Sequence, residues 1–137
     1  MITWGVPGNN ATAAATDERE AFATFDALLH ERNTDTHQLD LIHYQYGSAL
    51  FTAGQMERAA QEFLAAAAVP GAEASQATMA RLRAAQALDL AGKRKDAVTQ
   101  YQAVLARPNV YDSQDEARRG LREPYHQSEQ KKQEDEN

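Results

Sequence analysis

One segment of the chain recurs further along it, and the two copies align without a gap. Residues 53–70 read AGQMERAAQEFLAAAAVP, and residues 91–108 read AGKRKDAVTQYQAVLARP. The positions that match in kind are Gly54 and Gly92, Ala59 and Ala97, Phe63 and Tyr101, Ala66 and Val104, and Pro70 and Pro108. An internal repeat of this length indicates an array of similar structural units, so it constrains the fold more than any other feature of the sequence. We call the separation of Gly54 from Gly92 the repeat period.

The repeat also extends towards the N-terminus. One repeat period before Ala59, Phe63 and Ala66 stand Ala21, Phe25 and Leu28, which again place a small residue, an aromatic ring and an apolar residue at i, i+4 and i+7. This spacing puts the three side chains on one face of a helix. We therefore predict a half unit at residues 17–31, which has the second helix of a unit but lacks the first.

The segments that precede the two full copies match as well, and they have the pattern of amphipathic helices. The aligned pairs are Leu41 and Met79, Tyr44 and Leu82, Gly47 and Ala85, Ala49 and Ala87, and Leu50 and Leu88. Each segment ends at a glycine that suits a left-handed turn between helices, and a proline ends the helix that follows. Each unit is thus predicted to be a pair of helices joined by a tight turn.

These patterns predict an all-α fold, since no segment alternates like a strand. The two full units would span about residues 40–70 and 78–108, within a helical repeat domain at 17–123. The expected helices lie near residues 17–31, 36–53, 55–68, 73–91 and 93–107, with a short capping helix near 113–123.

The two ends of the chain are predicted to lie outside the repeat domain. Residues 1–16 are expected to be irregular, because glycine, proline and asparagine interrupt them. Residues 124–137 are expected to form a polar, flexible tail, since residues 126–137 contain no apolar side chain that burial could order. The expected N-terminal caps of helices are Thr16 or Asp17, Asp35 with Gln38, and Ser113 with Glu116.

The composition argues against several classes of function. The chain of 137 residues has a net charge of −6 and no cysteine, so thiolate chemistry is absent and binding to nucleic acid or to an anionic membrane is not expected. The longest apolar run, residues 63–69, is too short to cross a bilayer, and the N-terminus lacks the early positive charge of a signal peptide. By default we expect a soluble, cytoplasmic protein.

The repeat resembles the tetratricopeptide repeat (TPR). Along each repeat, that family favours five residue types at separate positions, in this order: Gly or Ala, then Gly, then Ala, then an aromatic residue, then Pro. The corresponding pairs in this chain are, in the same order, Gly47 and Ala85, Gly54 and Gly92, Ala59 and Ala97, Phe63 and Tyr101, and Pro70 and Pro108. Two features depart from the family. The repeat period is longer than the usual one by about one helical turn, and His43 and Arg81 replace a large aromatic residue of the first helix.

The resemblance covers residues 17–108 and implies antiparallel helix pairs stacked as a short right-handed α-solenoid. Since the concave groove of this family binds a peptide or a partner helix, we expect a non-catalytic protein–protein interaction module or scaffold. The C-terminal closing segment also resembles that of many bacterial members. The resemblance places the following residues in the groove: Tyr44, Ser48, Phe51, Leu82, Arg83, Gln86 and Asp89. Tyr44, Phe51 and Leu82 could instead be core residues, and Arg83 and Asp89 could be solvated charges. Some members clamp a terminal carboxylate with a Lys and an Asn of the first helix. The corresponding positions here hold Tyr44 with Ser48 and Leu82 with Gln86, so this clamp is missing.

The N-terminal half unit raises the question of what covers its apolar face. Without a first helix, Phe22 and Leu29 are expected to expose apolar surface, which usually marks an interface. Three arrangements would cover this face: Trp4 and Val6 folding back as a lid, pairing of two chains in a homo-oligomer, or an origin of the chain as the tail of a longer repeat protein. Structural self-association through residues 17–31 is therefore one alternative function, and a small acidic chaperone is another.

We expect no enzyme activity, no cofactor and no metal site. Ser48 in YGSAL lacks the preceding strand of a nucleophile elbow, and no glycine-rich phosphate-binding motif occurs. His37, Asp40 and His43 follow one another at intervals of three residues, so they fan out around a helix and do not converge on one metal ion. A protein or peptide is therefore the expected partner.

Overall fold

The structure, a computed structural model, describes residues 7–31 and 36–127, and the side chains of residues 17–31 and 38–127. Within these residues the chain forms six helices and no strand, which confirms the predicted all-α fold. From the second helix onwards, every helix begins and ends within two residues of its predicted bounds. The helices are α1 (Pro7–Leu29), α2 (Thr36–Thr52), α3 (Met56–Ala68), α4 (Ala74–Leu90), α5 (Arg94–Leu105) and α6 (Ser113–Arg122).

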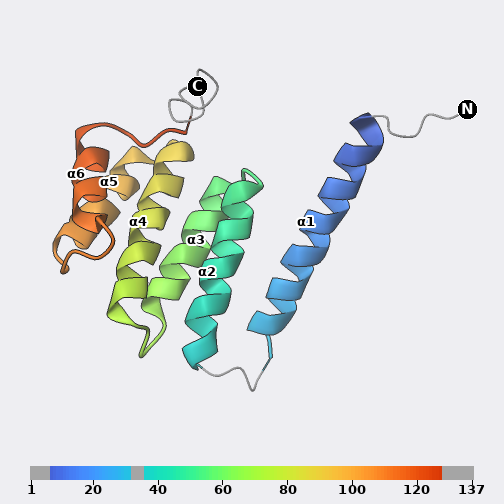
Figure 1. Cartoon of the computed structure of the whole chain (residues 1–137), viewed down its shortest axis with the longest axis horizontal. Helices are drawn as coiled ribbons and strands as arrows, with labels where there is room; N and C mark the ends of the chain where they lie inside the picture. The colour runs from blue at the N-terminus through green and yellow to red at the C-terminus, as the bar shows by residue number, and fades with distance from the viewer. Residues whose placement is uncertain (1–6, 32–35, 128–137) are drawn as a thin grey trace, which may run out of the picture.

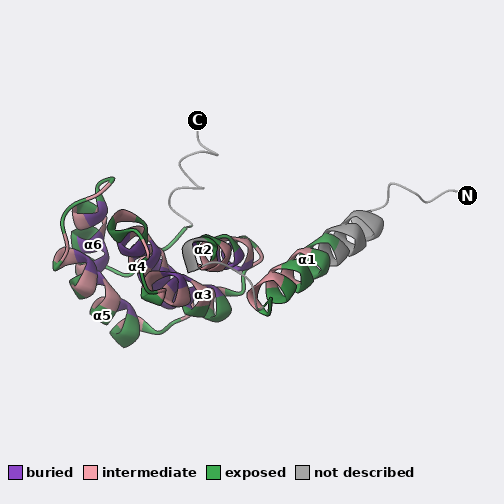
Figure 2. Ribbon diagram, turned by 90° about the horizontal axis from the view of Figure 1, so that it is seen from below, coloured by how far each residue is buried: buried purple, intermediate pink, exposed green. Residues whose placement is uncertain are grey.

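The helices follow one another in space as they do along the chain. Each helix packs against the next one, and α6 also contacts α4. Consecutive helices from α2 onwards run in opposite directions (Figure 1). Seen from below, α2, α4 and α6 form one row, and α3 and α5 form another (Figure 2). The pairs α2–α3 and α4–α5 are therefore two helical hairpins placed side by side, with α1 and α6 at the two ends.

The turns inside the two hairpins are equivalent and lie one repeat period apart. The Gln55 N–H donates to the Leu50 carbonyl oxygen at 2.9 Å, and the equivalent bond from Lys93 measures 2.8 Å. Gly54 and Gly92 have φ angles of +83° and +78°, which a residue with a Cβ atom adopts only with strain. Because both turns have the six-to-one bond of a Schellman motif, the predicted left-handed glycine turns are confirmed.

A polar contact joins the two helices of each hairpin, again at equivalent positions. His43 Nδ1 lies 2.8 Å from Glu62 Oε1, between α2 and α3. The equivalent contact, one repeat period later, is the hydrogen bond that Arg81 donates to Gln100 Oε1 at 3.4 Å, between α4 and α5. His43 and Arg81, which are equivalent in the repeat, thus link the helices of each pair through polar atoms.

The centre of the core is built from aromatic rings that lie against glycines. Phe63 and Tyr101 are fully buried. A Cβ atom on Gly47 of α2 would lie 2.8 Å from Phe63 Cδ1, and a Cβ atom on Gly120 of α6 would overlap the Tyr101 ring. Phe25, the third ring of the repeat, is only half-buried and stacks on a tyrosine of α2 with the ring centroids 5.2 Å apart. The ring at the N-terminal edge of the array therefore has a different environment from the two inside it.

The first helix begins at Pro7, so the prediction of an irregular segment at residues 1–16 is wrong for residues 7–16. Proline is favourable at the start of a helix, because its missing N–H would have no acceptor within the helix. The sequence ATAAAT that follows consists mostly of alanine, which has the highest intrinsic helix propensity. These local preferences outweigh the glycine and the two asparagines of the first turn.

Two of the predicted caps are absent from the structure. Thr16 and Asp17 lie inside α1 and do not begin it. The Ser113 hydroxyl accepts the N–H of Val110 at 3.0 Å, so it does not form the predicted capping box with Glu116. The reason is that the backbone before α6 turns back on itself, which directs this hydroxyl to the preceding loop instead of the first turn of the helix.

The remaining predictions about the ends of the chain are tested only in part. The predicted lid residues Trp4 and Val6, the capping residue Asp35 and residues 128–137 lie outside the described residues. The start of the predicted flexible tail is attached to the helices, because the Tyr125 N–H donates to the carboxylate of a residue in α4 at 2.9 Å.

Candidate functional site

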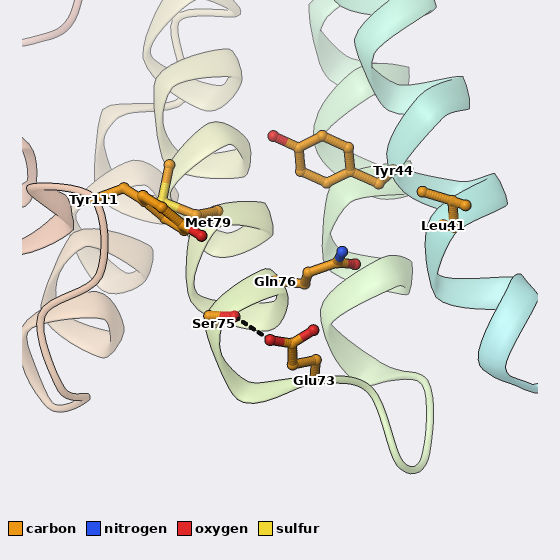
Figure 3. Close-up of a pocket in the computed structure, with 7 residues that line it drawn as sticks. All are labelled: Leu41, Tyr44, Glu73, Ser75, Gln76, Met79 and Tyr111. Atoms are coloured by element: carbon orange, nitrogen blue, oxygen red, sulfur yellow. Dashed lines mark hydrogen bonds between the residues drawn. The ribbon is translucent and has the colours of Figure 1, made fainter.

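A pocket of about 310 Å³ opens between the N-terminal turns of α2 and α4 (Figure 3). Leu41 and Tyr44 line it from α2, and Figure 3 shows the Tyr44 ring reaching across towards Met79 of α4. The other lining residues come from the start of α4 and from the connection between α5 and α6: Glu73, Ser75, Gln76 and Tyr111. The pocket is thus built from three segments that are distant in sequence.

Two matching helical stripes continue from the pocket along α2 and α4, and we call the surface between these stripes the α2–α4 groove. Its residues are Leu41, Tyr44, Ser48 and Phe51 on α2, and Gln76, Met79, Arg83 and Gln86 on α4. Both stripes advance by three, four and three residues, so each one follows a single face of its helix. Leu41 is 45% exposed, whereas Phe51 and Gln86 at the other end are 7% and 9% exposed. Exposure therefore falls along the groove from the N-terminal towards the C-terminal ends of the two helices, and we call the more buried end its narrow end.

The wall of the pocket on α2 is held in place by the core beneath it. The Tyr44 ring meets the buried Phe63 ring edge to face, with centroids 5.3 Å apart and an interplanar angle of 64°. Edge-to-face contacts of this kind orient a ring beyond what apolar burial alone does. Tyr44 is half-buried, so a fixed apolar face with a polar tip is presented to the pocket.

Tyr111 stands at the mouth of the pocket in an unusual backbone conformation. Tyr111 and Asp112 have φ angles of +48° and +62°, a region that costs of the order of 1–3 kcal/mol for a residue with a Cβ atom. The buried Ser113 holds this turn, because its N–H donates to the Val110 carbonyl oxygen at 2.8 Å. The Tyr111 side chain is 81% exposed. Backbone strain that presents an exposed ring beside a pocket is typical of functional loops.

Arg83 lies towards the narrow end of the groove. Its guanidinium carbon is 4.8 Å from the centroid of the Phe51 ring and 5.5 Å from that of Phe63. The Arg83 Nε atom is buried and has no hydrogen-bond partner among the described residues. Arg83 on α4 therefore lies against aromatic rings of α2 and α3, and its place in a binding groove stays a prediction.

The other groove residues that the resemblance implied have different places. Tyr44 lines the pocket, and Ser48 is half-buried on the α2 stripe. Phe51 and Gln86 are buried at the narrow end, and Leu82 is 2% exposed in the core. Phe51 and Leu82 both belong to the hydrophobic core cluster, so for these two residues the alternative interpretation as core residues is correct.

Asp89 is an internal anchor, contrary to its predicted place in the groove. Its side chain is fully buried and accepts hydrogen bonds from Arg94, at 3.1 Å to each carboxylate oxygen, and from the Tyr101 hydroxyl at 2.8 Å. It also accepts the Tyr125 N–H at 2.9 Å. Because these donors come from α5 and from the segment after α6, the carboxylate joins three parts of the chain and is not available to a partner.

Burial and the bond to Asp89 both act on Tyr101. The ring is fully buried, and desolvation of the charged form, together with the hydrogen bond to Asp89 and its negative charge, raises the pKa of the Tyr101 phenol well above its usual value. The phenol therefore stays protonated and continues to donate to the carboxylate over the whole neutral and moderately alkaline range.

The two residues proposed for self-association are partly covered by α2. Phe22 and Leu29 are half-buried and pack against the core. The Phe22 ring lies 5.9 Å from that of Tyr46, and the Arg58 guanidinium lies 5.9 Å from the centre of the same ring. Intramolecular packing thus takes up part of the apolar surface that the sequence led us to expect at this end.

Several residues of the pocket were not anticipated. The pairing of Leu41 with Met79 in the repeat was a usable signal, since it marks equivalent positions one turn before the expected groove residues. For Gln76 the signal was the helical spacing of three residues to Met79. Tyr111 had no periodic signal, because it lies in a loop whose direction depends on contacts of Ser113 with the preceding backbone.

Other kinds of site find little support in the described residues. In that part of the chain no three His, Asp or Glu side chains gather as metal ligands, and His43 is paired with Glu62. None of the helices in the described ranges is long and apolar enough to cross a membrane. The chain matches no protein-family model, no curated protein and no solved structure.

Proposed function

We propose that this chain is a non-catalytic interaction module that binds an extended peptide of a partner protein in the α2–α4 groove. Its helix pairs would be TPR-like units in a short right-handed α-solenoid. The turns and the polar links that recur after one repeat period support this organisation. In repeat proteins of this kind, stacking leaves an extended concave surface for binding.

The observation that carries the proposal is the pocket between α2 and α4. It exposes apolar side chains of Leu41, Met79 and Tyr111 in a concave place, with Gln76 as a polar group beside them. Its volume of about 310 Å³ is at the lower end of the range for ligand pockets, which suits one apolar side chain of a peptide better than a whole cofactor. Methionine adapts its shape to an incoming group, and tyrosine offers a ring with a hydrogen-bonding tip.

Selection from a random peptide library displayed on phage, with the full chain immobilised, tests the proposal. Peptides that bind are expected to share an apolar residue. Their affinity should fall about tenfold or more for the double variant Met79→Ala, Tyr111→Ala, because exposed contacts at the centre of a binding site are worth about 1–2 kcal/mol. Tyr111 is exposed, whereas Met79 is half-buried and packs against the edge of the core, so the double variant must first show an unchanged helical circular dichroism spectrum.

The matched control is Thr99→Ala on α5. Thr99 is exposed and bonds only to the Lys95 carbonyl oxygen of its own helix. This variant should bind the selected peptides as the original chain does. Peptides that bind the double variant and the original chain equally well would show that the pocket is not the binding site.

A second candidate function is self-association through α1. The observation that favours it is the partial exposure of Phe22, Phe25 and Leu29 on an end helix that has a neighbour in α2 but none before it in the described residues. Sedimentation equilibrium over a wide concentration range separates the two functions. A strictly monomeric mass at the highest concentration would exclude the second one.

A further inference from the structure

We propose that Arg83 and Ser48 form a carboxylate-binding subsite at the narrow end of the α2–α4 groove. The partner would then be an extended peptide with an acidic side chain two residues away from an apolar one. This inference rests on the proposed function, because it assigns the class of peptide that the same groove takes.

Arg83 is fixed in position but lacks a counter-charge. The rings of Phe51 and Phe63 hold its guanidinium at 4.8 and 5.5 Å, a contact that orients a cation without neutralising it. Its Nε atom is buried without a partner, and it forms no ion pair with any carboxylate of the described residues. A partly buried guanidinium in this state gains a strong, charge-assisted bond when a carboxylate approaches it.

Arg58 shows what a satisfied arginine looks like in the same chain. Its guanidinium also lies over two rings, those of Phe22 and Tyr46, at 5.9 and 5.8 Å. Unlike Arg83, it donates hydrogen bonds to the Tyr46 hydroxyl at 2.6 Å and to Gln55 Oε1 at 2.9 Å. Stacking on rings therefore does not by itself deprive an arginine of acceptors. Arg81 also has a buried Nε without a partner among the described residues, but it still donates to Gln100 through Nη1, whereas Arg83 has no side-chain hydrogen bond to a described residue.

Ser48 supplies a second polar group at the same level of the groove. Ser48 on α2 and Arg83 on α4 are each the third residue of their stripe, and the two stripes advance in equal steps. The contact of Arg83 with Phe51, which is one turn beyond Ser48, agrees with this register. The half-buried Ser48 hydroxyl has no hydrogen bond to another described residue, so it can donate to a carboxylate.

The distance between pocket and subsite defines the spacing of the peptide. Met79 and Arg83 are four residues apart on α4, which corresponds to about 6 Å along the helix at ~1.5 Å per residue. In an extended peptide, side chains on the same face are two residues and about 6.6 Å apart at ~3.3 Å per residue. An apolar side chain in the pocket therefore brings the side chain two positions away to Arg83.

The charges along the groove determine at which end an acid is accepted. Glu73 lies at the open end, where the Ser75 hydroxyl donates to its carboxylate at 2.8 Å, and its negative charge opposes a second carboxylate there. The positive charge of Arg83 lies at the narrow end. An acidic side chain is therefore stabilised only on the narrow side of the pocket.

Chemical-shift titration of the full, isotope-labelled chain with short blocked peptides tests the subsite. The probe is Ac-Gly-Phe-Gly-Glu-Gly-NH2, its neutral match has Gln in place of Glu, and a third peptide has the order Glu-Gly-Phe. At least one of the two acidic peptides should bind about five- to tenfold more tightly than the neutral one, with shifts at Tyr44, Met79 and Arg83. The preference is expected because charge-assisted hydrogen bonds are about twice as strong as neutral ones.

Three variants isolate the contribution of the guanidinium. Arg83→Gln should abolish the preference for Glu over Gln while retaining the weaker binding of the neutral peptide. Arg83→Lys keeps the charge and should retain part of the preference, which controls for disturbed packing over the two rings. Arg19→Gln on α1 removes the same charge far from the groove and should change nothing.

The outcomes separate the two proposals. If both peptides bind equally and shift the pocket residues in the original chain, the carboxylate subsite is wrong but the peptide groove stands. If no peptide shifts the pocket residues, both proposals fail.

The acidic residues Glu134, Asp135 and Glu136 near the C-terminus are an alternative source of carboxylates. A full chain with Glu134→Gln, Asp135→Asn and Glu136→Gln tests it. If these changes alone shift the signals of Arg83 and Ser48, and added peptide produces no preference for Glu, the subsite serves the chain's own tail and the proposed external partner is wrong.

Discussion

At the residue scale, one pair of side chains shows how two similar units have diverged. In the first hairpin, Phe51 and Phe63 meet edge to face with centroids 6.5 Å apart. The equivalent residues one repeat period later are Asp89 and Tyr101, which are joined by a hydrogen bond of 2.8 Å. The same place in the repeat is thus apolar beside the groove in one unit and a polar anchor in the other. Repeat patterns predict that two such residues touch but not by which interaction.

The Asp89–Tyr101 bond leads to a pH-dependent prediction for Tyr101→Phe. At neutral pH this variant should be less stable by about 1–2 kcal/mol, because a buried carboxylate loses one of its donors. The raised pKa of the Tyr101 phenol means that the folded chain keeps this proton above pH 10, where the unfolded chain releases it. The stability of the original chain therefore falls with rising pH, by about 1.4 kcal/mol per unit above pH 10 for this group. The difference between the two chains should shrink accordingly.

Urea unfolding at pH 7, 10 and 11 measures this difference. Tyr111→Phe serves as the control, because its ring is 81% exposed and its variant should follow the pH profile of the original chain. Parallel profiles for the original chain and Tyr101→Phe would contradict the assignment of a buried, protonated phenol.

At the scale of the elements, the helices and their turns follow from local sequence. Glycine at positions 54 and 92 has φ above +75° in two turns with the same hydrogen bonds. These turns were predictable, because only a few residue types adopt this conformation and the apolar periodicity changes at the same positions. The start of α1 differs from the prediction, because a proline at the first helical position favours a helix there despite the glycine and asparagines near residues 7–10.

The equivalence of the turns predicts equal effects for Gly54→Ala and Gly92→Ala. Each should destabilise the chain by about 1 kcal/mol, since a Cβ atom is strained at this φ although no other atom obstructs it. The two effects should agree within about 0.5 kcal/mol and add in the double variant. Guanidinium unfolding of the single and double variants measures them. A clear inequality would mean that the two turns are not structurally equivalent.

At the scale of the whole molecule, the two ends of the array differ. α6 packs against both α5 and α4, and its Gly120 receives the buried Tyr101 ring. α1 contacts α2 through half-buried rings and leans away from the hairpins (Figure 1). The C-terminal end is thus closed by a helix that completes the core, whereas the N-terminal end has a looser neighbour.

This asymmetry predicts that the chain tolerates the loss of α1 better than the loss of α6. A chain that ends at residue 110 would uncover Tyr101 and Val104, which are both fully buried, so it should lose cooperative unfolding or aggregate. A chain that begins at residue 36 should remain helical and unfold cooperatively at a somewhat lower temperature. Thermal melts followed by circular dichroism compare the two. Equal losses of stability would contradict the closing role of α6.

The sequence alone determined the helices, the turns between them and the repeat period, because these depend on local spacing and on glycine and proline. Which side chains form the groove was decided only by the packing of the hairpins. The repeat alignment pairs Tyr44 with Leu82, but the groove pairs it with Met79, three positions earlier on α4. Leu82 and the side chain of Asp89 are buried inside the array, whereas Arg83 lies against the rings of Phe51 and Phe63 beside the groove. No local pattern encodes these placements, since they result from the fit of buried rings and small residues between neighbouring hairpins.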